Sequence, residues 1–301
     1  MPIESPADWN NLGRHIAAVI FVATLVLAGT VAAQRNPAPN DLASPAEDAE
    51  RIGRLTANGV RIERGLVTAW FSSGAMTQEQ MRSVVERLVT GINAIESFVH
   101  IPRRWQDSRQ RRVTYFFDDA AFFIPHATVN RQVLMPVSRL RDGKAPLLHE
   151  TTHALLTPPQ GRRPLAWLTE GIAAYVAKSV SAETGVPEGD ALDIGAITEL
   201  DAKCATGLSS EQGPQILPFI GSPANLQPLY AMEPASLVRQ VFYGCSASFT
   251  KYLVQQFGIE RIVDLLPEND PHKKLEDVSR ARMAELRGRW MAAIKPQRGR
   301  L

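Results

Sequence analysis

The chain has 301 residues, of which 45% are hydrophobic and 21% are charged. This hydrophobic content excludes an intrinsically disordered chain, and 20 glycines are far too few for a collagen-like repeat. The 33 Lys and Arg nearly balance the 31 Asp and Glu, so we expect no nucleic-acid partner. Two cysteines cannot form a disulfide framework, and a chain of this length can bury a core without one.

The N-terminal segment has the pattern of an export signal. Ile16–Ala33 holds 18 consecutive residues without a charge. Small residues lie three and one positions before Gln34, which favours a signal peptide, residues 1–33, cleaved before Gln34. The alternative is a membrane anchor through residues 16–33, because a run of this length can just span a bilayer. Both predict an exported domain, either periplasmic or secreted, or anchored with the domain outside the cytoplasm.

The rest of the chain divides into a linker, residues 34–55, and one domain, residues 56–301. The linker is polar and contains Pro, Asn and Ser without apolar periodicity. The first half of the domain contains three predicted strands: Leu66–Phe71, Val113–Phe117 and Gln132–Val137. Pro136 predicts that the third strand lies at a sheet edge, because proline lacks the N–H that an inner strand donates.

Helical periodicity dominates the remainder of the domain. Thr77 and Gln80 predict a capping box, and apolar residues after them repeat at helical spacing, so we expect this helix to pack on a sheet. The second half predicts helices over 146–156, 165–180, 236–257, 259–266 and 274–294. Residues 181–234 are rich in Gly, Pro, Ser and Asp and predict a long loop. Strands followed by helices indicate an α+β fold.

The candidate chemistry is concentrated in the run His149-Glu150-Thr151-Thr152-His153, inside an apolar helical segment. Residues four apart on a helix point to one side, so His149 and His153 can bind one metal ion. Glu150 lies about 100° around the helix, where it can reach a water on that ion. Hydrolysis by zinc requires this combination of neutral nitrogen ligands and a carboxylate that transfers a proton.

Glu170 is the candidate for the third protein ligand that a catalytic zinc site needs. It is a lone acid in an apolar helical segment, and a buried carboxylate is costly unless it is paired or bound to a metal. Gly171, Ala173 and Ala174 would let its helix approach the first one closely. The alternative for Glu170 is an exposed acid or an ordinary ion pair.

At these residues the chain resembles the gluzincin metallopeptidases, in particular the peptidase-MA-like group. The resemblance rests on HETTH, on WLTEGIAAY from Trp167 to Tyr175, and on the segment from Tyr243 to Leu253. It implies a zincin-like fold, in which a small mixed sheet with helices precedes a mostly helical lobe, with zinc in the cleft between them. It also implies one Zn²⁺ ion held by His149, His153 and Glu170.

The resemblance further implies hydrolysis of a peptide or protein substrate. Glu150 would be the general base and acid, and Tyr243 would stabilise the oxyanion of the tetrahedral intermediate. The chain departs from the thermolysin branch at Ala174, where that branch has an acid that orients a histidine. Among the other candidates, we expect Tyr175 to pack in the core and His126 to be an exposed loop residue.

Two further features lie near the candidate site. The strand Gln132–Val137 precedes the zinc helix, so we expect that an extended peptide can add to its edge beside the metal. Cys204 and Cys245 are predicted to form a disulfide in an oxidising compartment, the alternative being two separate buried thiols.

Two other functions stay open on the sequence alone. An exported binding or assembly factor would keep the fold and the metal without cleaving a substrate, although a purely structural zinc would not require Glu150. A zinc hydrolase acting on a non-peptide ester or amide would use the same residues.

Overall fold

The structure is a computed structural model that describes residues 45–101, 112–119, 125–128, 130–157, 165–190, 192–224, 226–232 and 234–295. All of these belong to the second of two units in the chain, residues 41–301. The predicted signal peptide or anchor, residues 1–33, lies outside the described residues. In the described part, no helix combines the length and apolar character that crossing a bilayer requires.

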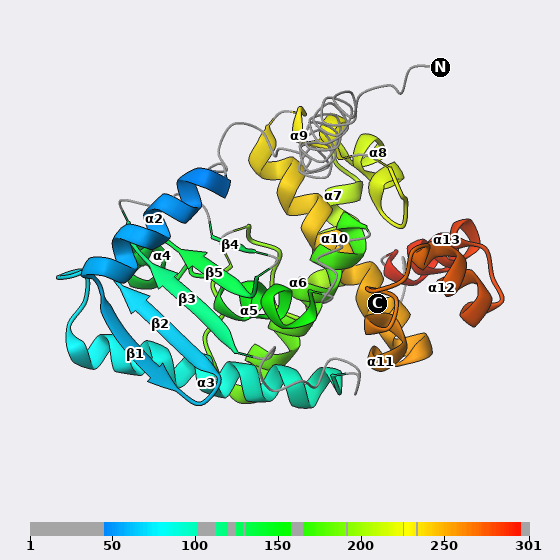
Figure 1. Ribbon diagram of the computed structural model, residues 1–301. Coiled ribbons are helices and arrows are strands. Elements are labelled where there is room, and N and C mark those ends of the chain that lie inside the picture. The colour runs from blue at the N-terminus through cyan, green and yellow to red at the C-terminus, as the bar shows by residue number, and fades with distance from the viewer. Residues whose placement is uncertain are drawn as a thin grey trace, which may run out of the picture. The chain divides into compact units, whose positions relative to one another are not determined.

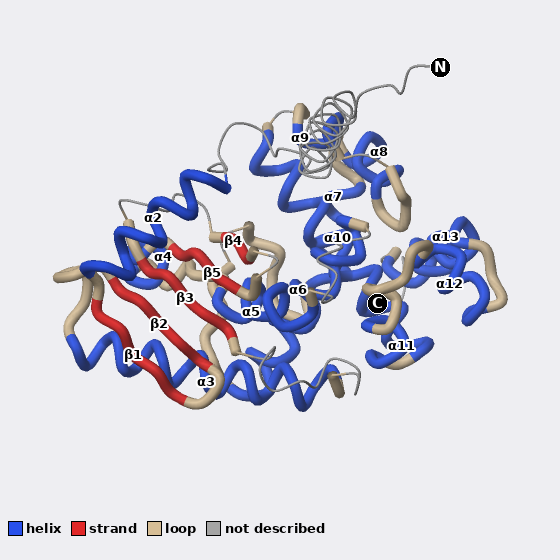
Figure 2. Tube along the Cα trace, in the orientation of Figure 1, coloured by secondary structure: helices blue, strands red, loops and turns tan. Residues whose placement is uncertain are grey.

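The order of elements confirms the α+β class (Figure 1). The strands belong to the first half, and helices make up most of the second half (Figure 2). In chain order the elements are α2 (Pro45–Asn58), β1 (Val60–Arg64), β2 (Val67–Phe71), α3 (Gln78–Val99), β3 (Val113–Phe117), β4 (His126–Ala127), β5 (Gln132–Met135), α4 (Val137–Arg141), α5 (Leu147–Leu156), α6 (Ala166–Thr184), α7 (Leu200–Leu208), α8 (Gly213–Ile216), the 3₁₀ helix η3 (Leu217–Phe219), α9 (Gln227–Tyr230), α10 (Ala235–Phe257), α11 (Ile259–Val263), α12 (Pro271–Ser279) and α13 (Met283–Ile294).

The strands form one mixed sheet in the order β1-β2-β3-β5-β4. β2, β3 and β5 are parallel, whereas β1 and β4 pair antiparallel at the two ends of the sheet. In the parallel part, Tyr115 lies in register with Ala69 on one side and Val133 on the other. This confirms a small mixed sheet.

The inner strands alternate their side chains between two apolar layers. One layer joins the sheet to the packed helices through Val67, Ala69, Phe71, Val113, Tyr115, Phe117, Val133 and Met135. In the other layer, Phe116 and Leu134 pack with Ile52 and Leu55 of α2. Helices therefore cover both faces, with α2 on one and α3 and α5 on the other, as a largely parallel sheet requires (Figure 1).

The expected helix after Thr77 is confirmed as α3. The Thr77 hydroxyl accepts the Gln80 N–H at 3.2 Å, and the Gln80 side chain accepts the Thr77 N–H at 2.8 Å. The apolar face of α3 is buried against β1, β2, α5 and α6. The local sequence was sufficient to predict this helix, because the capping box and the apolar periodicity both involve residues of α3 and its N-cap.

The predicted linker, residues 34–55, is wrong in its last part, because residues 45–58 form α2. Most of α2 is polar and exposed, so its sequence shows only a narrow apolar stripe. Ile52 and Leu55 supply that stripe and contact the sheet layer formed by Phe116 and Leu134. The sheet, rather than helical periodicity alone, accounts for the helix.

Gln132–Val137 is not an edge strand. β5 lies between β3 and β4, and β4 pairs with it at Val133 and Leu134. Pro136 follows β5 and caps α4, so its missing N–H removes no bond from the sheet. The expectation that a peptide adds directly to this strand is therefore wrong where β4 already pairs, and β4 is the edge.

The predicted loop over residues 181–234 contains α7, α8, η3 and α9. These short helices are held by buried apolar residues, which include Leu200, Ile216 and Leu229. The predicted helix 274–294 is also divided, because Arg280 takes a left-handed φ of 53° and ends α12 before α13 begins. Short helices depend on tertiary packing, which local periodicity does not reveal.

α6 packs closely on α10 as well as on α5. A methyl group on Gly171 would lie 2.5 Å from the backbone oxygen of Ser246 in α10. Ala174 belongs to a buried cluster with Leu200 of α7 and Ala247 of α10. Gly171, Ala173 and Ala174 were expected to let α6 approach α5 closely; Gly171 and Ala174 instead make room for α10.

Candidate metal centre

The helix α5 carries the HETTH run and is anchored at both its start and its side. Pro146 precedes it, and no side chain within the helix caps its first turn. Instead, the carboxylate of Glu188 accepts the backbone N–H of Leu148 at 2.7 Å and that of His149 at 3.2 Å. A carboxylate at this position satisfies free N–H groups and interacts favourably with the helix dipole.

Glu188 reaches this position because α6 ends sharply. Gly185 follows the last turn of α6 with φ 71°, a left-handed conformation that glycine adopts without strain. The chain then returns to α5, where the Gly189 N–H donates to Ala145 O at 2.9 Å. Glu188 was not expected from the sequence, because no local pattern marks it and its partners lie about 40 residues earlier in the chain.

The side of α5 is fixed to the sheet by a buried hydrogen-bond chain. The Thr151 hydroxyl donates to Leu147 O at 2.6 Å, so the Tyr115 hydroxyl, 2.7 Å away, is the donor to Thr151. Tyr115 lies on β3, and both of these side chains are buried. The apolar layer and this polar contact together determine which side of α5 faces away from the sheet.

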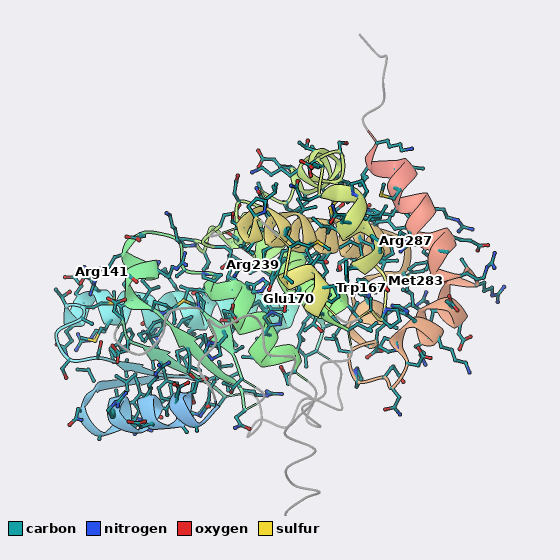
Figure 3. The ribbon with its side chains drawn as sticks, turned by 90° about the horizontal axis from the view of Figure 1, so that it is seen from above. Arg141, Trp167, Glu170, Arg239, Met283 and Arg287 are labelled. Atoms are coloured by element: carbon teal, nitrogen blue, oxygen red, sulfur yellow. A yellow bond between two sulfur atoms is a disulfide. The ribbon has the colours of Figure 1, made fainter. Side chains whose placement is uncertain are left out.

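The structure brings together His149, His153 and Glu170 in one cluster. The His149 Nε2 and His153 Nε2 atoms are 3.0 Å apart. The Glu170 Oε2 atom lies 3.2 Å from the first and 3.1 Å from the second. α5 supplies both imidazoles and α6 the carboxylate of Glu170, which is labelled in Figure 3.

This triangle of atoms fits a metal ion, and His149, His153 and Glu170 form a group that could hold one. Two imidazoles can supply at most two Nε2–H donors, so hydrogen bonds do not account for all three short contacts. A tetrahedral zinc ion with bonds of about 2.0–2.1 Å holds its ligand atoms roughly 3.3 Å apart. The observed separations of 3.0–3.2 Å are close to that value.

Burial distinguishes Glu170 from an ordinary surface acid. Its side chain is 16% exposed, and the side chains of His149 and His153 are 13% and 5% exposed. Burial by itself raises the pKa of Glu170, but the charges and hydrogen bonds of His153 and His149 outweigh it and lower that pKa. The low exposure excludes the alternative of an exposed acid, whereas the short contacts with both imidazoles are also those of an ion pair.

Surrounding acidic side chains favour a positive charge at His149. Burial lowers the pKa of His149, but the hydrogen bond to Glu170 and the charges of Glu150, Glu170 and Glu188 raise it overall. Burial raises the pKa of Glu188 to about 7, although the two backbone N–H groups and the positive charges nearby oppose that increase. A positive charge on the imidazole nitrogens is thus stabilised by surrounding carboxylates.

Glu150 is buried beside the cluster without belonging to it. Its residue surface is 7% exposed, and its negative charge acts on His149. It is absent from the three-residue metal-binding group, as expected for a residue rotated away from the two histidines. Glu150 is therefore a buried acid beside the group that could hold a metal ion.

Tyr243 of α10 is brought to the same site. Its ring centroid lies 6.1 Å from that of His149, with the planes inclined by 32°. Two residues further on, Cys245 forms a disulfide with Cys204 of α7, which confirms the predicted pairing. Both cysteines are buried, so the bond ties α7 to the part of α10 that presents Tyr243.

The other two candidates lie outside the cluster. Tyr175 packs against the hydrophobic core, as expected, with its ring centroid 6.0 Å from that of Phe98. His126 is not an exposed loop residue: it lies in β4, and its Nε2 is 3.0 Å from Asp48 Oδ2 of α2. The contact between α2 and β4 was not predictable because α2 itself was not expected.

Comparisons with family models, curated proteins and solved structures find no match for this chain.

Proposed function

We propose that the protein is a zinc-dependent metallopeptidase of the gluzincin type. One Zn²⁺ ion would be held by His149, His153 and Glu170. The observation that carries the proposal is the triangle of two Nε2 atoms and one carboxylate oxygen, 3.0–3.2 Å apart, with buried Glu150 beside it. A purely structural site does not require such an additional carboxylate.

When bound, zinc supplies a Lewis acid that polarises a carbonyl group and lowers the pKa of a water ligand to about 7. Glu150 would take a proton from the attacking water and deliver it to the leaving amine. The hydroxyl of Tyr243 would donate to the oxyanion that develops on the substrate carbonyl. Its ring, 6.1 Å from that of His149, supports this role.

The proposed substrate is a peptide or protein outside the cytoplasm. The apolar run at residues 16–33 supports export, followed by cleavage or by anchoring of the chain in a membrane. The disulfide between Cys204 and Cys245 is consistent with an oxidising compartment.

The test combines metal analysis of the full chain with digestion of a peptide library. The wild type is expected to bind about one zinc and to cleave. Glu150→Gln should retain zinc and lose cleavage by about 10²- to 10⁴-fold, whereas His153→Ala should lose the metal. Glu79→Gln is the matched control, because Glu79 is an exposed acid in the first turn of α3.

Several outcomes would reject parts of the proposal. Cleavage by Glu150→Gln at the wild-type rate would reject the role of Glu150. Zinc binding with hydrolysis of esters or amides, but of no peptide, would favour the non-peptide hydrolase. Zinc binding without any hydrolysis would favour a binding or assembly factor.

A further inference from the structure

α10 carries a charged residue on the same side as Tyr243. Arg239 precedes Tyr243 by four positions, so the two side chains share one face of the helix. Tyr243 lies beside His149, and Arg239 lies one helical turn before Tyr243 on α10. α10 packs on α6, which carries Glu170, and Figure 3 labels both Arg239 and Glu170.

The guanidinium of Arg239 has unused hydrogen-bonding capacity. Its Nε donates to Ala235 O at 3.3 Å, within its own helix. Among the described residues, no carboxylate forms an ion pair with it, although the residue is half-buried. A guanidinium has five N–H donors, and a partly desolvated charge without a partner is unfavourable.

Other cations, on α6, α7 and α10, differ from Arg239 in this respect. Lys178, Lys203 and Lys251 pair with Asp190, Asp193 and Asp201, respectively. These pairs connect α6, α7 and α10 to one another and to the segment before α7. Their charges are paired within the fold, whereas Arg239 has no carboxylate partner among the described residues.

We propose that Arg239 binds a carboxylate of the substrate and so gives the site a preference for acidic peptides. The inference rests on the proposed peptidase function, since it identifies a substrate class for that site. The planar guanidinium can hold a carboxylate through two parallel hydrogen bonds, which lysine cannot do. The carboxylate comes either from an Asp or Glu side chain or from the C-terminus of the peptide.

The kinetic test uses fluorescein-labelled octapeptides of Ala and Leu. Each carries Glu or Gln at one position, scanned along the peptide, and ends in a free carboxylate or an amide. Wild type should favour one carboxylate over its neutral counterpart by about 10- to 100-fold in kcat/KM, mainly through KM. The position or terminus that shows this difference identifies which carboxylate is bound.

Variants assign the preference to the guanidinium. Arg239→Gln should abolish the discrimination while it leaves kcat for the neutral peptide unchanged, and Arg239→Lys should retain part of it. Arg261→Gln is the control, because Arg261 is exposed on α11. Equal losses on acidic and neutral peptides in Arg239→Gln, or no discrimination by wild type, would overturn the proposal.

A binding measurement separates this proposal from the peptidase function. Fluorescence anisotropy with the same peptides, on zinc-loaded Glu150→Gln protein, requires no cleavage. Tighter binding of the acidic peptide that disappears in Glu150→Gln/Arg239→Gln supports Arg239 even if the wild type cleaves nothing. Equal binding of acidic and neutral peptides by Glu150→Gln would reject the role of Arg239 and leave the peptidase proposal unaffected.

Discussion

The carboxylate of Glu188 accepts the backbone N–H of His149 at 3.2 Å. A residue beyond the end of α6 therefore caps the helix that carries two of the three candidate ligands. α6 also supplies Glu170, which contacts His149. The α6 helix and the segment after it therefore contact α5 at two points, Glu170 at the ligand cluster and Glu188 at the start of α5. The cap thus links the stability of the fold to the spacing of the metal-binding atoms.

Removing the cap should weaken both the fold and metal binding. Glu188→Ala is expected to lower the free energy of unfolding by about 1–2 kcal/mol, because two backbone N–H groups lose their acceptor. Glu188→Gln keeps an oxygen acceptor and should lower the free energy of unfolding by less. Urea unfolding and zinc competition with a chelator measure the two effects. An equal effect from Glu183→Gln, an exposed acid in the last turn of α6, would contradict this role.

Tyr243→Phe tests the proposed oxyanion donor. The loss of one hydroxyl should reduce kcat by about 10²- to 10³-fold, because the hydrogen bond is made in the transition state. Zinc content and KM should change little. Tyr252→Phe, on the same helix, is the matched control because Tyr252 packs on Phe249. If steady-state kinetics give Tyr243→Phe the kcat of the wild type, Tyr243 has no role in the mechanism.

Gly171→Ala should destabilise the contact between α6 and α10. The new methyl group would lie 2.5 Å from Ser246 O, so the helices must separate at a cost of about 1–3 kcal/mol. Weaker zinc binding is also expected, since Glu170 is adjacent. In α13, Gly288 has open space, so Gly288→Ala should instead stabilise by up to about 1 kcal/mol. Thermal or urea unfolding should show a lower stability for Gly171→Ala and a higher stability for Gly288→Ala. Stabilisation by Gly171→Ala would contradict the close approach of α6 and α10.

The disulfide should contribute substantially to stability. Cys204 and Cys245 are 41 positions apart, and cross-linking a loop of this length stabilises by about 3–4 kcal/mol in the chain-entropy model. Cys204→Ser/Cys245→Ser should show that loss in urea unfolding, and reduced wild type should behave similarly. Alkylation without reductant, followed by mass spectrometry, provides the direct check. Two labelled thiols on the exported protein would exclude the bond.

The predictable parts of the fold had their signals within a few residues of one another. The capping box of Thr77 and Gln80 marked the start of α3, and the spacing of His149 and His153 placed both imidazoles on one side of α5. α2 and the short helices within residues 181–234 had no such signal. They form where apolar side chains meet a surface supplied by distant parts of the chain.

The sequence by itself determined the inventory of the site: two histidines one helical turn apart, an adjacent acid at Glu150, and a lone acid at Glu170. Those relationships follow from helix geometry and from the cost of burying a carboxylate. Only the tertiary structure decided that Glu170 lies 3.1–3.2 Å from both imidazoles, that Glu188 caps α5 and that Arg239 lacks an ion-pair partner among the described residues. Each depends on how α5, α6 and α10 pack, because their contacts join residues far apart in the chain.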